Sequence, residues 1–131
     1  MKNILITGIT GQDGIFLTDT ILSKEKNINI VGISRSISNK QFFKNLSPIN
    51  NLQFDKVNLI NIDLNNFSDV SNFINDFKPS VVYNLSGPSS PSESIRNKEK
   101  YIMIETIFNN ITKALINSNN MCNFFQASSS E

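Results

Sequence analysis

The sequence predicts an α/β protein with a doubly wound parallel sheet of five strands. Short, β-branched apolar runs alternate along the chain with longer segments of helical periodicity, which is typical of βαβ units. The apolar runs hardly alternate with polar residues, as expected for strands that helices cover on both faces. The chain has 131 residues, enough for one domain with its own core.

The first half of the chain provides three strands and one helix. Residues 3–7 form an apolar strand that stops at Gly8. Residues 13–24 form a helix whose apolar side chains recur at helical spacing, namely Ile15, Phe16, Leu17, Ile21 and Leu22. Residues 29–33 and 57–62 form the second and third strands. The polar stretch 34–53 between them is expected to be a loop with a short helix around residues 41–46.

The second half continues the same alternation. Residues 68–77 form a helix, with Asn66 or Ser68 as its N-cap and Pro79 as its end. Strands are expected at residues 81–85 and 122–127, with a long amphipathic helix at residues 98–118 between them. Right-handed crossovers then predict the strand order 3-2-1-4-5, with the switch point between strands 1 and 4.

Composition excludes several functions. Twelve Lys and Arg against eleven Asp and Glu give a net charge of +1, which offers no electrostatic footprint for nucleic acid or an acidic membrane. The absence of histidine excludes Ser-His-Asp and Cys-His catalysis and any His-ligated metal, so no metal is expected. Cys122 is the single cysteine and fits a reducing compartment. No signal peptide or membrane span is recognisable, so a cytoplasmic location is expected.

The strongest motif joins the first strand to the first helix. Gly8, Gly11 and Gly14 form G-x-x-G-x-x-G at this junction and are three of the five glycines of the chain. Such glycines allow a tight turn, close approach of a pyrophosphate and close helix–strand contact, so the motif predicts a Rossmann-like dinucleotide site. The alternative is a turn that needs glycine only for packing.

The end of the second strand indicates which dinucleotide binds. NAD-binding sites place an acidic residue here for the ribose 2′-OH. This sequence instead has Arg35, Ser36 and Ser38, which can bind a 2′-phosphate. NADP is therefore favoured over NAD, the alternative being a solvated surface arginine.

Other strand ends carry weaker signals. Asp63 can accept from an adenine amino group while Leu64 packs on the ring, or Asp63 simply forms an Asx turn. Small residues after strand 4 allow the backbone to pass close to the second ribose of the dinucleotide, and Ser89 and Ser90 can then face a substrate. The alternative is that this segment is an ordinary Gly-Pro turn. After strand 5, a hydroxyl and the Glu131 carboxylate can act on a sugar, or form a frayed tail.

Together these segments resemble the extended short-chain dehydrogenase/reductases, and within them the GDP-mannose 4,6-dehydratase family. The resemblance rests on residues 6–14, 32–36, 63–64, 82–85 and 126–131, of which T-G-x-T-G-Q-D-G and Q-A-S-S-S-E are the most specific. It spans residues 1–131 but less than half of a family member. It therefore implies a partial, N-terminal NAD(P)-binding domain without the substrate domain.

The resemblance also implies residue roles. The pyrophosphate would be held by Gly8, Ile9, Thr10, Gly11, Gln12, Asp13 and Gly14. Arg35, Ser36 and Ser38 would hold the 2′-phosphate, and Asp63 and Leu64 the adenine. The nicotinamide ribose and the substrate would be lined by Leu85, Ser86, Gly87 and Ser89, and Tyr101 on the long helix would reach the cofactor. Ser129, in place of the usual threonine, and Glu131 would be catalytic.

The implied activity is that of an NADP-dependent lyase, which converts GDP-mannose to GDP-4-keto-6-deoxy-mannose with loss of water. The family's Tyr-x-x-x-Lys pair is absent from these residues, so the chain alone is expected to be inactive. Two alternatives remain: a non-catalytic NADP-binding module, and a sister nucleotide-sugar epimerase or reductase. The expected partners are a nucleotide sugar and either a second copy or a chain that supplies the missing half.

Overall fold

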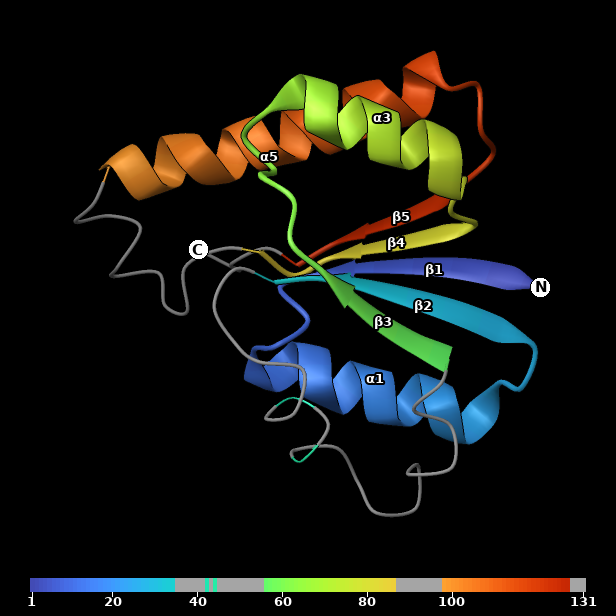
Figure 1. Cartoon of the computed structure of the whole chain (residues 1–131). Coiled ribbons are helices and arrows are strands. Elements are labelled where there is room, and N and C mark those ends of the chain that lie inside the picture. Colours follow the sequence, from blue (N-terminus) through green and yellow to red (C-terminus); the bar gives the residue numbers. More distant parts are fainter. Residues whose placement is uncertain (35–41, 43, 45–55, 87–97, 128–131) are drawn as a thin grey trace.

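The computed structural model describes residues 1–34, 42, 44, 56–86 and 98–127, without the side chains of residues 99–101. The chain forms five strands and three longer helices in these residues (Figure 1). The strands are β1 (Lys2–Thr7), β2 (Ile28–Ile33), β3 (Val57–Ile60), β4 (Val81–Asn84) and β5 (Asn123–Gln126). The helices are α1 (Gln12–Lys24), α3 (Phe67–Phe77) and α5 (Lys98–Asn117).

The five strands form one parallel sheet in the order β3-β2-β1-β4-β5. The predicted order and fold class are therefore confirmed. The register places Thr7 of β1 beside Asn84 of β4, and Asn84 beside Gln126 of β5. The strands β1, β4 and β5 thus end level with one another at the carboxyl edge of the sheet.

Helices lie on both faces of this sheet, with α1 on one face and α3 and α5 on the other (Figure 1). Each face has its own core. Ile4 and Ile6 of β1 belong to the cluster that also contains Ile21 and Leu22 of α1. Leu5, between them in sequence, belongs to the cluster formed with α3 and α5, as the two-residue period of a strand requires.

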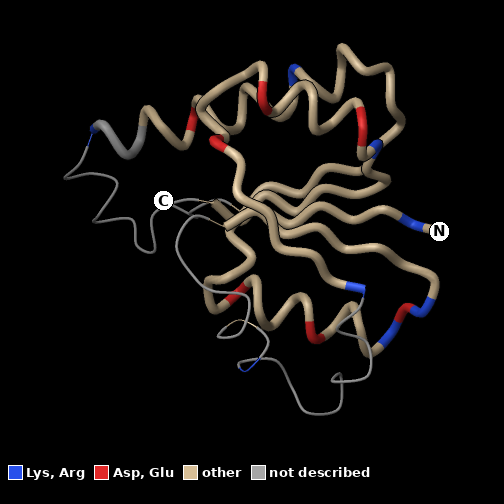
Figure 2. The backbone as a smooth tube through the Cα atoms, in the orientation of Figure 1, with Lys and Arg blue, Asp and Glu red and all other residues tan. Residues whose placement is uncertain are grey.

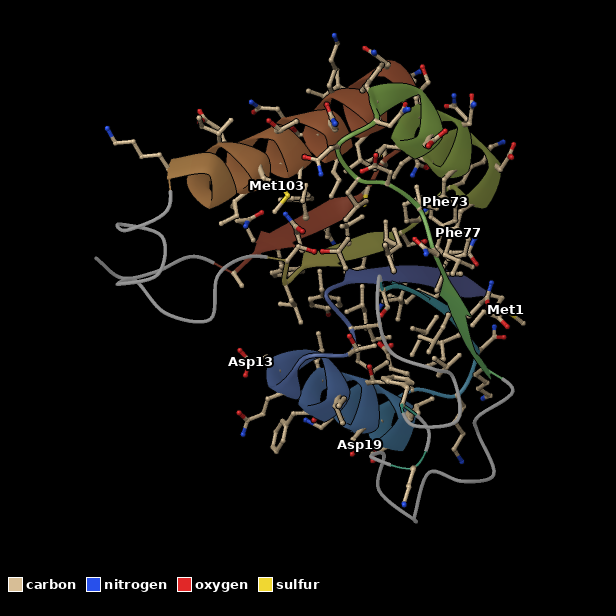
Figure 3. All side chains as sticks on the ribbon, turned by 60° about the vertical axis from the view of Figure 1, so that its left-hand side comes forward. Met1, Asp13, Asp19, Phe73, Phe77 and Met103 are labelled. Carbon is tan, nitrogen blue, oxygen red and sulfur yellow. The ribbon has the colours of Figure 1, made fainter. Side chains whose placement is uncertain are left out.

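The second core is completed by side chains that project from α3 and α5 toward the sheet. Phe73 and Phe77 stack with ring centroids 5.2 Å apart, and Met103 packs against the same cluster (Figure 3). Figure 2 shows charge concentrated on the helices and connections, and Lys2 is the single charged residue in the five strands.

Helix α3 begins and ends as its sequence predicts. Asn66 is the N-cap, and its side chain accepts a hydrogen bond from the backbone N–H of Asp69 at 3.2 Å. Ser68 lies within the helix and is not the cap. Lys78 ends the helix in the left-handed conformation, φ 51°, immediately before Pro79.

Three expectations need correction. Strand β3 ends at Ile60 rather than residue 62, because β2, its partner, ends at Ile33 opposite Ile60. Phe16 of α1 is 75% exposed and does not join the core. Strand β5 has one neighbour among the described strands, and its exposed and half-buried residues alternate, so it is not covered on both faces.

The short helix expected around residues 41–46 lies largely outside the described residues. Phe42 is described and is fully buried in the core on the α1 face.

Candidate functional site

The turn that follows β1 is shaped by glycine. Gly8 has φ +67°, a left-handed conformation that side chains disfavour. A Cβ at Gly8 would lie 2.9 Å from both the carbonyl carbon and the oxygen of Leu85. The backbone N–H of Gly11 donates to the Gly8 oxygen at 3.1 Å and closes the turn. The chain after β1 therefore passes against the backbone that leaves β4.

The first turn of α1 lies tightly against the same loop. A Cβ at Gly14 would lie 2.4 Å from the oxygen of Ile9, so the helix can approach this backbone only with glycine there. The N-cap of α1 is Gly11, which offers no side-chain hydrogen bond to the first turn. N–H groups at such a helix start, together with the helix dipole, favour an anion.

The end of β2 lies beside this turn. The hydroxyl of Ser34 donates to the hydroxyl of Thr10 at 3.3 Å, and both residues are half-buried. Ser34, which follows β2, therefore lies next to the glycine turn. Arg35, Ser36 and Ser38 themselves lie outside the described residues.

The residues after β3 adopt a turn of their own. The Asp63 carboxylate accepts from the backbone N–H of Asn65 at 3.0 Å, which is the Asx turn considered above as the alternative reading. Leu64 is 9% exposed and packs in the core of the α3 and α5 face. Its carbonyl oxygen accepts from the side-chain amide of Asn110 at 2.9 Å. Asp63 remains exposed to solvent, whereas Leu64 has little surface left for a ligand.

A chain of polar side chains crosses the sheet at this edge. The Thr7 hydroxyl donates to the side-chain oxygen of Asn84, and the Asn84 amide donates to the side-chain oxygen of Gln126 at 2.6 Å. The backbone N–H of Ser86 lies 3.4 Å from the Thr7 hydroxyl. Thr7 and Asn84 are fully buried. None of Thr7, Asn84 and Gln126 was expected at the site, although a polar residue that ends an apolar run is the signal that marks them.

The other expected site residues around this edge fall into three groups. Leu85 and Ser86 are half-buried beside Gly8, as expected of residues at the switch point. Tyr101 lies in α5, but its side chain is not described. The remaining expected residues lie outside the described part of the chain: Gly87, Ser89, Ser90, Ser129 and Glu131.

Two further properties concern the described residues alone. They contain no group of three or more Cys, Asp and Glu side chains that could hold a metal ion. Among them, no helix combines the length and apolar character that a bilayer crossing requires.

Comparison with known proteins identifies the sequence family. The profile of the family described as GDP-mannose 4,6 dehydratase matches residues 5–131. The chain is 31% identical over 140 residues to the GDP-mannose 4,6-dehydratase of Yersinia enterocolitica, covering 100% of this chain and 36% of that protein. It is 38% identical over 95 residues to GDP-mannose 4,6 dehydratase 2 of Arabidopsis thaliana, covering 67% of this chain and 24% of that protein.

Solved structures agree on the fold. The UDP-Glc/GlcNAc 4-epimerase of Campylobacter jejuni matches with a TM-score of 0.79 and 19% identity, over 99% of this chain and 38% of that one. The UDP-glucose 4-epimerase of Thermotoga maritima matches with a TM-score of 0.74 and 15% identity, over 97% of this chain and 38% of that one. The chain thus spans little more than a third of the length of such relatives. From its sequence, the chain belongs to the GDP-mannose 4,6-dehydratase family of extended short-chain dehydrogenase/reductases.

Proposed function

We propose that this chain is the NADP-binding part of a GDP-mannose 4,6-dehydratase and that residues 1–131 form a partial NAD(P)-binding domain. The glycine turn carries this proposal, because Gly8 and Gly14 bring backbone, rather than side chains, to the start of α1. Gly11, where a Cβ would meet only the Gly8 oxygen at 3.4 Å, adds no side chain beside the N–H groups that start α1, where a pyrophosphate can bind. Bound NADP would supply the hydride acceptor and donor of the reaction.

The preference for NADP over NAD rests on the residues that follow β2. Arg35, Ser36 and Ser38 stand where an NAD site would have an acidic residue. The hydrogen bond between Ser34 and Thr10 supports this assignment, because it holds Ser34, the residue before Arg35 in sequence, beside the glycine turn. A guanidinium binds a 2′-phosphate with two parallel hydrogen bonds.

The remaining contacts are assigned around the same edge. Asp63 has acceptor capacity left beyond its turn, because a carboxylate has about four acceptor positions. The adenine is assigned to the exposed Asp63, whereas Leu64, packed in the core, holds the turn that carries Asp63 rather than covering the ring. The nicotinamide ribose side is assigned to Leu85, Ser86, Gly87, Ser89 and Tyr101.

Ser129 and Glu131 are the proposed catalytic residues. They follow Gln126, which ends β5 level with the ends of β1 and β4. In the proposed dehydration, the Glu131 carboxylate takes the proton from C5 of the sugar, the C5–H electron pair forms the C5–C6 double bond as the C6–O bond breaks, and the C6 hydroxyl leaves with that proton as water. The Ser129 hydroxyl hydrogen-bonds a sugar oxygen. Ser89 and Ser90 are assigned to the GDP-mannose substrate. Because Tyr-x-x-x-Lys is absent, the chain alone should leave GDP-mannose unchanged.

Calorimetric titration with NADP⁺ and NAD⁺ tests the proposal. We expect NADP⁺ to bind at least about tenfold more tightly, since hydrogen bonds to a charged phosphate contribute about 1.5–3 kcal/mol. Arg35→Ala should bring the two dissociation constants together. Lys24→Ala, at the far end of α1, is the matched control and should preserve the preference. Tighter binding of NAD⁺ by the unaltered chain would contradict the assignment of Arg35, and no binding of either dinucleotide at millimolar concentration would contradict the function.

A further inference from the structure

The interior of the sheet contains two polar residues that an apolar core would not need. Thr7 and Asn84 are both 0% exposed, although they end strands whose other interior residues are apolar. A buried polar group costs free energy unless it is hydrogen-bonded. Here the Thr7 hydroxyl donates to the Asn84 side-chain oxygen, so removing either side chain would leave a buried polar group of the other without its partner.

The hydrogen bonds run in one direction across three strands. The Ser86 N–H points to the Thr7 oxygen, the Thr7 hydroxyl donates to Asn84, and Asn84 donates to Gln126. Gln126 in turn donates to the carbonyl of Ala127 at 3.0 Å. Because every link fixes which end of an amide donates, the chain holds a single arrangement of side chains.

Each member of this chain lies directly before a segment of the site. Thr7 precedes Gly8, Asn84 precedes Leu85, and Gln126 precedes residues 127–131. The Gly8 backbone lies so close to Leu85 that a Cβ would be 2.9 Å away. A small shift between β1 and β4 would therefore change the glycine turn itself.

We infer that Asn84 is a positioning residue: bonded to Thr7 and held in turn by Gln126, it sets the placement of the glycine turn against the backbone that leaves β4, and thereby the affinity for dinucleotide. This inference rests on the proposed function. It assigns a role in dinucleotide binding to Asn84, a fully buried residue that does not itself contact the ligand but positions the backbone that does.

A pair of shape-matched variants separates positioning from stability. Asn84→Leu keeps the branched shape but leaves the buried Thr7 hydroxyl without its acceptor, so it should lower both the melting temperature and NADP⁺ affinity. Adding Thr7→Val removes the orphaned hydroxyl, and replacing both partners by apolar groups of the same shape is close to neutral for stability. The half-buried Gln126 can bond water instead.

The double variant Thr7→Val/Asn84→Leu tests whether affinity depends on this hydrogen-bonded link independently of stability. We expect it to recover most of the lost melting temperature while binding NADP⁺ at least about tenfold more weakly than the unaltered chain. The matched control is Asn3→Leu on the same strand, four residues before Thr7 and near the amino end of β1; it removes an amide that donates to the Phe77 oxygen at 2.7 Å. That control should lower the melting temperature and leave affinity unchanged.

If the double variant does not melt cooperatively, Thr7→Ser and Thr7→Val provide the same comparison. Serine keeps the hydroxyl and loses the methyl group, whereas valine keeps the shape and loses the hydroxyl, so only Thr7→Ser should retain affinity. Equal binding by the stable double variant and the unaltered chain, or by the serine and valine variants, would overturn the inference alone. Failure of the unaltered chain to bind would overturn the proposed function and the inference with it.

Discussion

Gly14→Ala sets helix propensity against packing, so the sign of its effect is informative. Gly14 lies in the first turn of α1, where alanine would ordinarily stabilise a helix by up to about 1 kcal/mol. The new Cβ, however, would lie 2.4 Å from the oxygen of Ile9 and 2.6 Å from its carbonyl carbon and Cα. All three atoms belong to the backbone, so no rotamer change relieves the contact.

The size of the effect follows from these distances. The contact falls about 1 Å short of ordinary van der Waals separation, so α1 must move away from the glycine turn. Overpacking costs about 1–3 kcal/mol, and about 2–3 kcal/mol is expected here because the clashing atoms are all backbone, so the cost outweighs the gain in propensity. We expect a net loss of about 1–2 kcal/mol and a melting temperature lower by about 4–8 °C.

Thermal unfolding followed by circular dichroism measures this change. Gln12→Ala is the control, because Gln12 is exposed in the same turn and its replacement should change stability by less than about 0.5 kcal/mol. A melting temperature of Gly14→Ala at or above that of the unaltered chain would show that the close approach of α1 to Ile9 is not a constraint of the fold.

Three further predictions concern other parts of the molecule. Gly11→Ser should keep or raise the melting temperature, because serine is a favoured N-cap and a Cβ there meets only the Gly8 oxygen at 3.4 Å. Titration should nevertheless show weaker NADP⁺ binding, because the serine side chain enters the turn, and unchanged affinity would count against the turn as the phosphate site. Burial raises the pKa of the Cys122 thiol, so its alkylation rate by iodoacetamide should reach half-maximum at a higher pH than that of free cysteine, and an equal or lower midpoint would contradict this. The outer edge of β5 is unpaired among the described strands, and Phe125 is 53% exposed. Sizing chromatography should therefore show self-association that increases with protein concentration and is weaker for Phe125→Lys, whereas a monomer at high concentration would contradict this prediction.

The fold was predictable because two rules act on the sequence independently. Apolar runs such as residues 81–85 mark strands that are buried on both faces, and right-handed crossovers together with the glycine motif after the first strand favour the order 3-2-1-4-5. Phe16 shows where periodicity alone fails. It lies between Ile15 and Leu17, and three consecutive apolar residues cannot all face the same side of a helix.

The glycine turn was predictable for a similar reason, since few residues tolerate its conformation and its contacts. The link between Thr7, Asn84 and Gln126 was not. It depends on the register that sets these residues side by side, and in a parallel sheet the connecting helices determine that register over a long stretch of chain. The Asx turn of Asp63 was likewise only one of two possibilities, because an aspartate at this position can form such a turn but can equally keep its carboxylate free for a ligand.

The central claim is that the loop between β1 and α1 binds the pyrophosphate of a nicotinamide dinucleotide. Titration of the ¹⁵N-labelled chain with NADP⁺, followed by backbone amide chemical shifts, tests it most directly. The account predicts that the largest saturable shifts fall on the amides of residues 8–14. Unmoved amides in this loop at millimolar NADP⁺, with or without shifts elsewhere, would contradict it.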